Sequence, residues 1–239
     1  MSTIYFIRHG QAGARDAYDQ LSALGQQQAV LLGEYFAQQG WRFDQVITGL
    51  LQRQRHTAQL ALQQMKHTRA PQLDVRWNEF SLSEVYQGML PLLLRDDAAF
   101  AADYATMQAT LRVEPHAVRG AVGRCDRAVI EAWMNARFDE YTGEAWATFR
   151  ARVQGALPAL IEKTIETATE RTIAVFTSAT PIALAVSSVL NLNNDKTLGL
   201  MAMLQNSSVT TLRVREGEAW LFGFNATPHL PDAAMRTFR

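Results

Sequence analysis

Residues 4–10 read IYFIRHG, and this short stretch decides the fold. Its first four residues are β-branched or aromatic, a composition typical of a strand buried at the centre of a sheet. The strand then ends on Arg8 and His9, two side chains that can both carry a positive charge, followed by Gly10. This ending predicts that the chain leaves the core at Arg8 and His9 and meets a ligand there.

Strand-like and helix-like segments alternate through most of the chain. The expected strands are residues 3–7, 43–48, 171–178 and the two arms of a hairpin at 208–225 with its turn at 216–218. The expected helices are residues 21–39, 50–65, 143–166 (bent near Gly155 and Pro158) and 181–192. This alternation favours an α/β fold, with three α/β/α layers around a mostly parallel central sheet.

The centre of the chain has a different character. Helical patterns dominate residues 85–141, and glycines and prolines interrupt them. We therefore expect a mostly helical insertion, or cap, at 85–141 within a single α/β domain of residues 1–239. The segment VRWNEF at residues 75–80 is short, and it is compatible with either a strand or a loop.

Composition excludes several classes of function. The chain has 239 residues, 48% of them hydrophobic, which is enough for one large domain with a sizeable core. Lys plus Arg and Asp plus Glu both number 23, so the net charge is zero and we expect neither a nucleic-acid partner nor an anionic membrane surface. A homodimer is compatible with the sequence.

The single cysteine, Cys125, excludes a disulfide within the chain and a zinc site built from thiolates. It suits a reducing compartment. The chain begins in a strand pattern without a signal-like segment, and its longest apolar stretch, residues 181–192, is too short to span a bilayer. We expect a cytoplasmic protein that makes no contact with membranes.

The strand ends suggest a chemistry. Ligands of parallel sheets bind beyond the carboxyl ends of the strands, so Arg8, His9 and the residues after 177 are expected on one rim. The neighbouring guanidinium of Arg8 disfavours an imidazolium, which leaves His9 neutral and nucleophilic near pH 7. Neutral imidazole can attack phosphorus, while arginines hold the phosphoryl oxygens and a carboxylic acid protonates the leaving alcohol. Such a site needs no metal.

Several motifs now point to one family. FIRHGQA at residues 6–12 resembles the signature of the histidine phosphatase family, the phosphoglycerate-mutase-like superfamily. Further segments resemble that family's motifs in the same order, namely LSALGQQQA (21–29), ITGLLQRQRHTA (47–58), VRWNEF (75–80), NSSVTTL (206–212) and FNATPHL (224–230). The resemblance covers roughly residues 3–80 and 143–230 and leaves the helical insertion out.

The resemblance implies a role for each matched position. His9 is the expected nucleophile and Glu79 the general acid and later base. Arg8 and Arg53 are expected phosphate ligands. The rim of the pocket is expected to include Gln11 and Arg15. No cofactor and no metal are implied.

One position departs from the family pattern. The family has a second histidine at the end of the strand matched by residues 171–178, but Ser178 stands there, followed by Ala179. A serine hydroxyl donates one hydrogen bond to a phosphate oxygen but brings no charge, so Ser178 is expected to bind phosphate and to recover part of the lost rate. Loss of one such donor typically lowers the rate by about 10²–10³. His56 shares a helix face with Arg53 and is a candidate partial substitute.

Three functions remain open on the sequence. The first is a metal-independent phosphomonoesterase that acts on a small phosphorylated metabolite through a phosphohistidine at His9. The second is a phosphate-ligand-binding or regulatory protein whose catalysis is weak or lost because of Ser178. The third is a phosphoglycerate-type mutase. Substrate choice is expected to lie in residues 85–141, which carry no motif.

Overall fold

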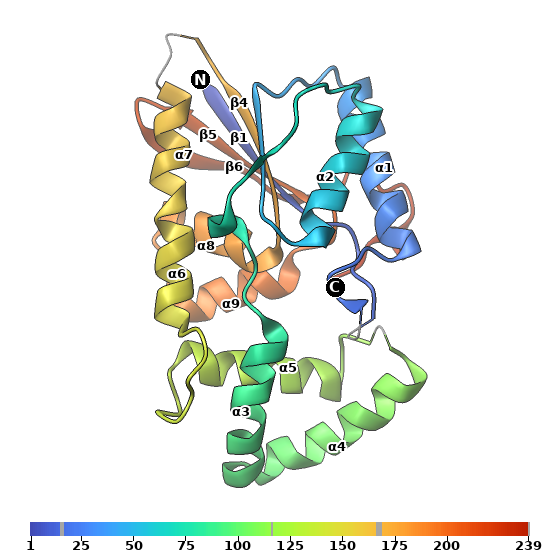
Figure 1. Ribbon diagram of the computed structural model, residues 1–239, viewed down its shortest axis with the longest axis vertical. Coiled ribbons are helices and arrows are strands. Elements are labelled where there is room, and N and C mark those ends of the chain that lie inside the picture. Colours follow the sequence, from blue (N-terminus) through green and yellow to red (C-terminus); the bar gives the residue numbers. More distant parts are fainter. Residues whose placement is uncertain (15–16, 116, 166–168, 239) are drawn as a thin grey trace. The chain divides into compact units, whose positions relative to one another are not determined.

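The computed structural model describes residues 1–14, 17–115, 117–165 and 169–238. The chain divides into two compact units (Figure 1). One unit consists of Met1–Glu79 and Val153–Arg239, and the other of Phe80–Arg152. The segment expected to be an insertion, residues 85–141, lies inside the second unit.

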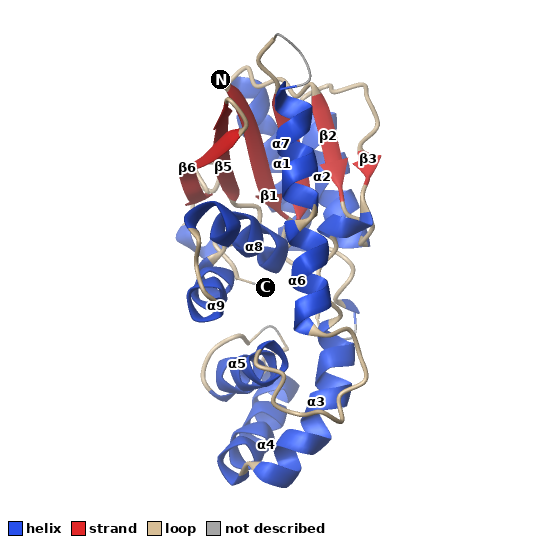
Figure 2. Cartoon of the chain, turned by 90° about the vertical axis from the view of Figure 1, so that its left-hand side faces the viewer, coloured by secondary structure: helices blue, strands red, loops and turns tan. Residues whose placement is uncertain are grey.

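A sheet forms the centre of the first unit. Its strands among the described residues are β1 (Ser2–Arg8), β2 (Gln45–Thr48), β3 (Gln72–Leu73), β4 (Thr172–Thr177), β5 (Val209–Arg215) and β6 (Glu218–Ala226), in the order β3-β2-β4-β1-β5-β6. The first four strands run parallel, and β5 and β6 continue the sheet in antiparallel fashion. The sheet is therefore mostly parallel, as predicted (Figure 2).

Helices cover both faces of this sheet. The helical elements of the unit are α1 (Ala23–Gln38), α2 (Gln52–Gln64), the 3₁₀ turn η2 (Val75–Trp77), α7 (Ala156–Ile165), α8 (Ala179–Leu190), α9 (Asn194–Met203) and the 3₁₀ turn η3 (Ala233–Met235). Helices α1 and α2 lie on one face, and α7 and α8 lie on the other (Figures 1 and 2). The predicted three-layer α/β/α architecture is confirmed.

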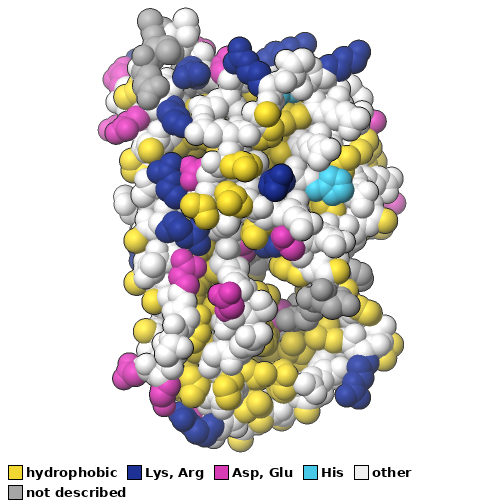
Figure 3. Space-filling model, in the orientation of Figure 1, with side chains coloured by type: hydrophobic (Ala, Val, Ile, Leu, Met, Phe, Trp, Pro, Cys, Tyr) yellow, Lys and Arg dark blue, Asp and Glu magenta, His cyan; other side chains and the backbone are white. Residues whose placement is uncertain are grey.

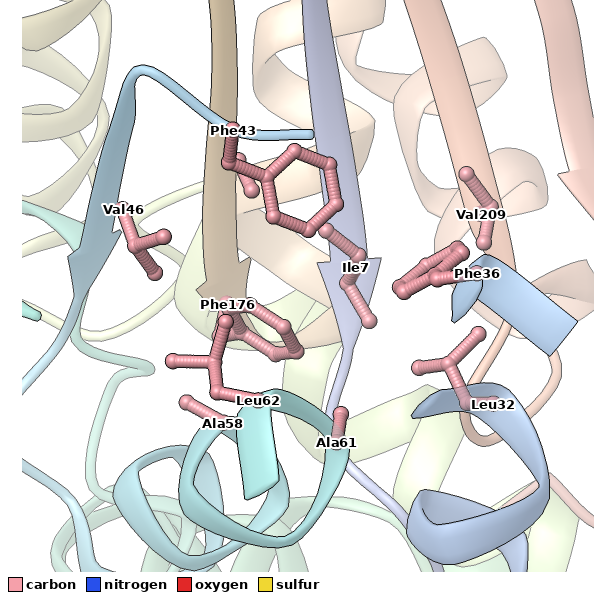
Figure 4. Close-up of a cluster of buried hydrophobic side chains, with 11 residues drawn as sticks. Ile7, Leu32, Phe36, Phe43, Val46, Ala58, Ala61, Leu62, Phe176 and Val209 are labelled. Carbon is pink, nitrogen blue, oxygen red and sulfur yellow. The ribbon is translucent and has the colours of Figure 1, made fainter. Parts of the chain in front are cut away.

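Strand β1 is buried on both faces, which explains why it reads as a continuous apolar run. Ile7 points toward α1 and α2, into a cluster of buried side chains (Figure 4). The other members of that cluster are Leu32, Phe36, Phe43, Val46, Ala58, Ala61, Leu62, Ala174, Phe176 and Val209. Phe6 contacts Trp77, with 5.3 Å between the ring centroids. Burial on both sides fixes the end of β1, and with it the position of His9.

The glycine after His9 is required by packing. A Cβ atom on Gly10 would lie 2.3 Å from the carbonyl oxygen of Gly25, and one on Gly25 would lie 2.1 Å from the carbonyl oxygen of Gln11. The start of α1 thus rests directly on the turn that follows β1. Ser22 completes the contact, because its hydroxyl caps α1 by accepting from the Gly25 amide at 3.0 Å.

The second unit is helical in its described part. Its helices are α3 (Leu82–Asp96), α4 (Ala98–Val113), α5 (Ala121–Met134) and most of α6 (Trp146–Gln154). Its aromatic core consists of Phe80, Trp133, Trp146 and Phe149, with ring centroids 4.6–5.8 Å apart. The mostly helical character predicted for residues 85–141 agrees with these elements.

Three segments differ from the expectations. Residues 143–166 contain two helices, because α6 ends at Gln154 and α7 begins at Ala156, with Gly155 between them. VRWNEF contains the 3₁₀ turn η2, in which the Arg76 amide donates to the side chain of the N-cap residue Asp74. Helix α9 lies outside the helices expected from the sequence. The hairpin β5–β6 does turn where expected, with Glu216 and Gly217 both at positive φ.

The surface agrees with the balanced composition. On the face drawn in Figure 3, Lys and Arg side chains are interspersed with Asp and Glu side chains. None of the described helices combines the length and the hydropathy needed to cross a membrane.

Candidate active site

The ends of β1 and β4 bring His9 and Ser178 together. The two strands are parallel neighbours, Arg8 is paired with Thr177, and the His9 amide donates to the Thr177 carbonyl at 2.9 Å. His9 and Ser178 are each only 1% exposed. The predicted rim at the carboxyl ends of these strands therefore exists, and both residues lie on it.

His9 is held as one neutral tautomer. Its Nδ1 lies 2.7 Å from the Gly10 carbonyl oxygen, which can only accept, so Nδ1 carries the proton. Nε2 then presents a lone pair and accepts from Nε of Arg53 at 3.2 Å. Burial lowers the pKa of His9 well below its ordinary value, and the charges of Arg53 and Arg8 lower it further. A neutral imidazole with a free lone pair on Nε2 is the form that attacks phosphorus.

Arg53 stands in the first turn of α2 and is almost wholly buried. Its Nη1 donates to Oδ1 of Asp19 at 2.9 Å, and its guanidinium lies 4.8 Å from the ring centroid of Tyr18. Oδ2 of Asp19 also accepts from the backbone amide of Gln52, the first residue of α2. One carboxylate therefore both caps α2 and pairs with the arginine that contacts His9.

Thr57 connects α2 to the turn after β1. Its Oγ1 accepts from the Gly10 amide at 3.0 Å and donates to the Arg53 carbonyl at 2.7 Å. Because Gly10 also receives the bond from His9, this single threonine fixes the spacing between the histidine turn and the helix that carries Arg53.

Arg8 is buried and is held by main-chain carbonyls. Its Nη1 donates to Leu204 and its Nη2 donates to Phe238 at 3.0 Å. Burial lowers the pKa of Arg8, whereas the nearby Tyr18 and Glu79 raise it. Arg8 therefore lies within electrostatic range of Glu79, with its two terminal nitrogens turned toward the C-terminal part of the chain.

Glu79 and Ser178 meet at the start of α8. Oε2 of Glu79 accepts from the backbone amide of Thr180 at 3.1 Å, and Ser178 is the N-cap residue of the same helix. The side chain of Ser178 does not cap the helix; its Oγ accepts from Nε2 of Gln54 at 2.8 Å. The positive end of the α8 dipole thus faces the carboxylate.

The remaining expected site residues are Gln11, Arg15 and His56. The side chain of Gln11 accepts from the Ser22 hydroxyl at 2.7 Å, which ties it to the start of α1. Arg15 lies outside the described residues. His56 is half-buried, and within the described part of the chain no hydrogen bond joins it to His9, Arg53 or Ser178.

Sequence reasoning missed Asp19 and Gln54. Gln54 carried a usable signal, since helical spacing places it on the buried stripe of α2 with Ala58 and Ala61, where a polar side chain is unusual. No sequence pattern marks Asp19, because it meets its hydrogen-bond partners only in the folded chain. Among the described residues, no group of three or more His, Cys, Asp or Glu side chains is arranged to hold a metal ion.

Comparison with protein families gives a clear match. Residues 4–129 and 122–227 match the model described as Histidine phosphatase superfamily (branch 1). The two matches together extend over most of the chain and include His9, Arg53, Glu79 and Ser178. A search of curated proteins found no match.

Solved structures show the same fold at low sequence identity. A putative alpha-ribazole-5'-P phosphatase from Escherichia coli is 19% identical with a TM-score of 0.63, over 95% of this chain and 97% of that one. A phosphoserine phosphatase mutant from Entamoeba histolytica, in complex with phosphoserine, is 19% identical with a TM-score of 0.59, over 96% and 100%. A phosphoglycerate mutase from Bacillus anthracis is 15% identical with a TM-score of 0.61, over 95% and 94%.

Proposed function

The chain belongs to the histidine phosphatase superfamily, and from this premise we propose that it is a metal-independent phosphomonoesterase that works through a phosphohistidine at His9. The observation that carries the proposal is the state of His9. Its proton sits on Nδ1, its Nε2 lone pair faces Arg53, and its lowered pKa keeps it neutral. This is the protonation state that attack of Nε2 on phosphorus requires.

The first half of the reaction transfers the phosphoryl group. The ester's phosphoryl oxygens take the place of Nε2 as partners of Arg53, which frees the lone pair. Nε2 then attacks phosphorus, the bond to the ester oxygen breaks, and Glu79 gives its proton to the leaving alkoxide. Arg8 and Ser178 supply further positive charge and a hydroxyl donor to the oxygens.

The second half returns the enzyme to its starting state. Glu79, now a carboxylate, takes a proton from water as the oxygen of that water attacks the phosphohistidine. The bond from phosphorus to Nε2 breaks and inorganic phosphate leaves, so that atoms and protons balance over the cycle. The groups used in these steps lie at the ends of β1 and β4, in the first turn of α2 and in the loop after η2, which carries Glu79. Gln11 and Arg15 remain proposed rim residues.

The substrate is proposed only as a class, a small phosphorylated metabolite. The similar structures include phosphatases and a mutase, and both kinds of protein move phosphoryl groups. Ser178 favours a second candidate, a phosphate-binding protein with weak turnover, because a hydroxyl brings no charge to the site.

Hydrolysis of p-nitrophenyl phosphate in the presence of EDTA tests the proposal. We expect turnover by the wild-type protein and its loss in His9→Ala, with His67→Ala as the control because His67 lies beyond the end of α2. Full activity in His9→Ala would contradict the mechanism. Tight phosphate binding without turnover on a broad panel of phosphoesters would favour the binding protein instead.

A further inference from the structure

Gln54 is a wholly buried amide beside the proposed site. It follows Arg53 in the first turn of α2 and has no exposed surface. Its Nε2 has two partners, since it lies 2.8 Å from Oγ of Ser178 and 3.2 Å from the carbonyl oxygen of Trp77. One side-chain nitrogen thus links α2 to the end of β4 and to the turn that precedes Glu79.

The contacts fix which way the amide points. A carbonyl oxygen can only accept, so the group that faces Trp77 is the NH₂ and not the side-chain oxygen. Both amide protons are then used, one on Trp77 and one on Ser178. Ser178 Oγ is therefore an acceptor in this contact, and its own proton points elsewhere.

That proton has no acceptor within the described part of the chain. The Oγ of Ser178 makes the bond from Gln54, and no second protein partner is present among the described residues. Ser178 is buried, and it lies next to His9 at the ends of β1 and β4. A buried hydroxyl whose proton is directed away from its neighbour is suited to an oxygen that arrives with a ligand.

We propose that Gln54 is a positioning residue that commits Ser178 to donate its hydroxyl proton to a phosphoryl oxygen bound at His9. The inference rests on the proposed function and adds the means by which a serine serves where the family has a histidine. Without the amide, no described side chain would hold the hydroxyl in one orientation. With it, the donor is oriented before the ligand binds.

A glycine makes room for this arrangement. A Cβ atom on Gly49, directly after β2, would lie 2.0 Å from Oε1 of Gln54. A Cβ atom there would also lie 2.7 Å from Oδ1 of Asn78, so a larger residue at position 49 requires the Gln54 amide or its neighbours to move. Oε1 itself has no hydrogen-bond partner in the described part of the chain, so the amide is held by its nitrogen and by packing.

A double-mutant cycle tests the proposal. Ser178→Ala removes the donor, and we expect the kcat for p-nitrophenyl phosphate to fall by about 10²-fold, as for one preorganised donor. Gln54→Met keeps the volume but releases the hydroxyl, and we expect a fall of about tenfold with KM little changed. In the double variant, we expect no loss beyond that of Ser178→Ala, because Gln54 acts only through the hydroxyl.

Independent effects would give a loss of about 10³-fold in the double variant, and that result would overturn the proposal. Unchanged turnover in Gln54→Met would also overturn it. Thermal melts check that each variant folds. If Gln54→Met does not fold, Gly49→Ala is used in its place to displace the Gln54 amide. The combination of Gly49→Ala with Ser178→Ala must then lower kcat no further than Ser178→Ala alone.

The proposed function can fail separately. Full activity in His9→Ala would remove the phosphohistidine, whatever the cycle shows. If the wild-type protein has no turnover, the same four proteins are compared by calorimetry with inorganic phosphate. The proposal then requires Gln54→Met to weaken binding in the wild-type background but not in Ser178→Ala, and equal weakening in both backgrounds would overturn it.

Discussion

Nε of Arg53 donates to Nε2 of His9 at 3.2 Å, so the guanidinium covers the atom that is proposed to attack phosphorus. The two groups lie 44 positions apart in the chain and meet because α2 packs beside the end of β1. In the proposed mechanism, a phosphoryl group must replace Nε2 of His9 as the hydrogen-bond partner of Arg53 before Nε2 can attack phosphorus. Binding and activation are then the same event.

The first prediction concerns the shape of the Arg53 side chain. Arg53→Lys keeps the charge but loses the planar guanidinium. Only the guanidinium can move from Nε2 of His9 to phosphoryl oxygens and bind two of them at once. We expect kcat/KM for p-nitrophenyl phosphate to fall by about 10²–10³-fold. Arg55→Lys, on the exposed side of the same helix, is the matched control and should leave kcat/KM unchanged. Equal losses in the two variants would contradict this role.

The second prediction concerns Asp19, which pairs with Arg53 and which we expect to compete with phosphate for its guanidinium. Asp19→Asn keeps an oxygen to cap α2 but removes the negative charge beside the site. The Asp19 side chain is 44% exposed, so water screens the pair and we expect only about a two- to fivefold tighter Kd for inorganic phosphate. Calorimetry measures this directly. Weaker phosphate binding by Asp19→Asn would contradict this prediction. It would mean that Asp19 helps binding by orienting Arg53 more than it opposes binding by competing with phosphate.

The third prediction concerns position 178, where the family resemblance leads us to expect a histidine in place of Ser178. An imidazole at position 178 needs the space that the Gln54 amide occupies, because that amide lies 2.8 Å from Oγ of Ser178. We expect Ser178→His alone to lower the melting temperature without raising kcat, since overpacking a core is destabilising. Combined with Gln54→Ala, it should raise kcat by about tenfold. A gain from the single variant, with stability intact, would show that the site already has room.

The fourth prediction concerns stability and pH. His229 is buried against Ser207, and burial lowers its pKa from 6.5 to about 4. The unfolded chain binds a proton there as the pH falls from 6.5 while the folded chain does not, so stability is complete above pH 6.5 and is lost toward pH 4. The loss from this one residue is about 3 kcal/mol at most.

Urea unfolding between pH 4 and pH 7 measures that loss. His229→Gln can keep a bond to Ser207 but does not titrate, so its free energy of unfolding should fall less steeply with acid. The dependence on pH that remains in His229→Gln includes a contribution from His9, whose pKa is also lowered by burial. Identical slopes in the two proteins would contradict the assignment.

The sequence predicted the layers and the strand ends because these follow from local pattern. An apolar run that stops on Arg8 and His9 predicts a central strand, and the pairing of β1 with both β4 and β5 confirms it. That a ligand binds at the end of this strand stays a prediction. The sequence also predicted a departure from the family pattern at Ser178. The chemical role of Ser178 could not be predicted, because the hydrogen-bond partner of its hydroxyl depends on the fold.

Gln54 and Asp19 show where sequence reasoning ends. Gln54 meets Ser178 across 124 positions, and Asp19 meets Arg53 across 34. Neither pair has a spacing that periodicity could detect. Arg8 shows the same limit, since its terminal nitrogens bind the carbonyls of Leu204 and Phe238, which only the folded chain brings near.

The most direct test of the central claim is to trap the phosphoenzyme. The protein is mixed with p-nitrophenyl phosphate, quenched in alkali, in which phosphohistidine survives, and digested for mass spectrometry. The account predicts one phosphate on the peptide that contains His9, with phosphorus NMR placing it on Nε2 rather than Nδ1. Turnover with an unmodified His9, or a phosphate on another residue, would contradict it.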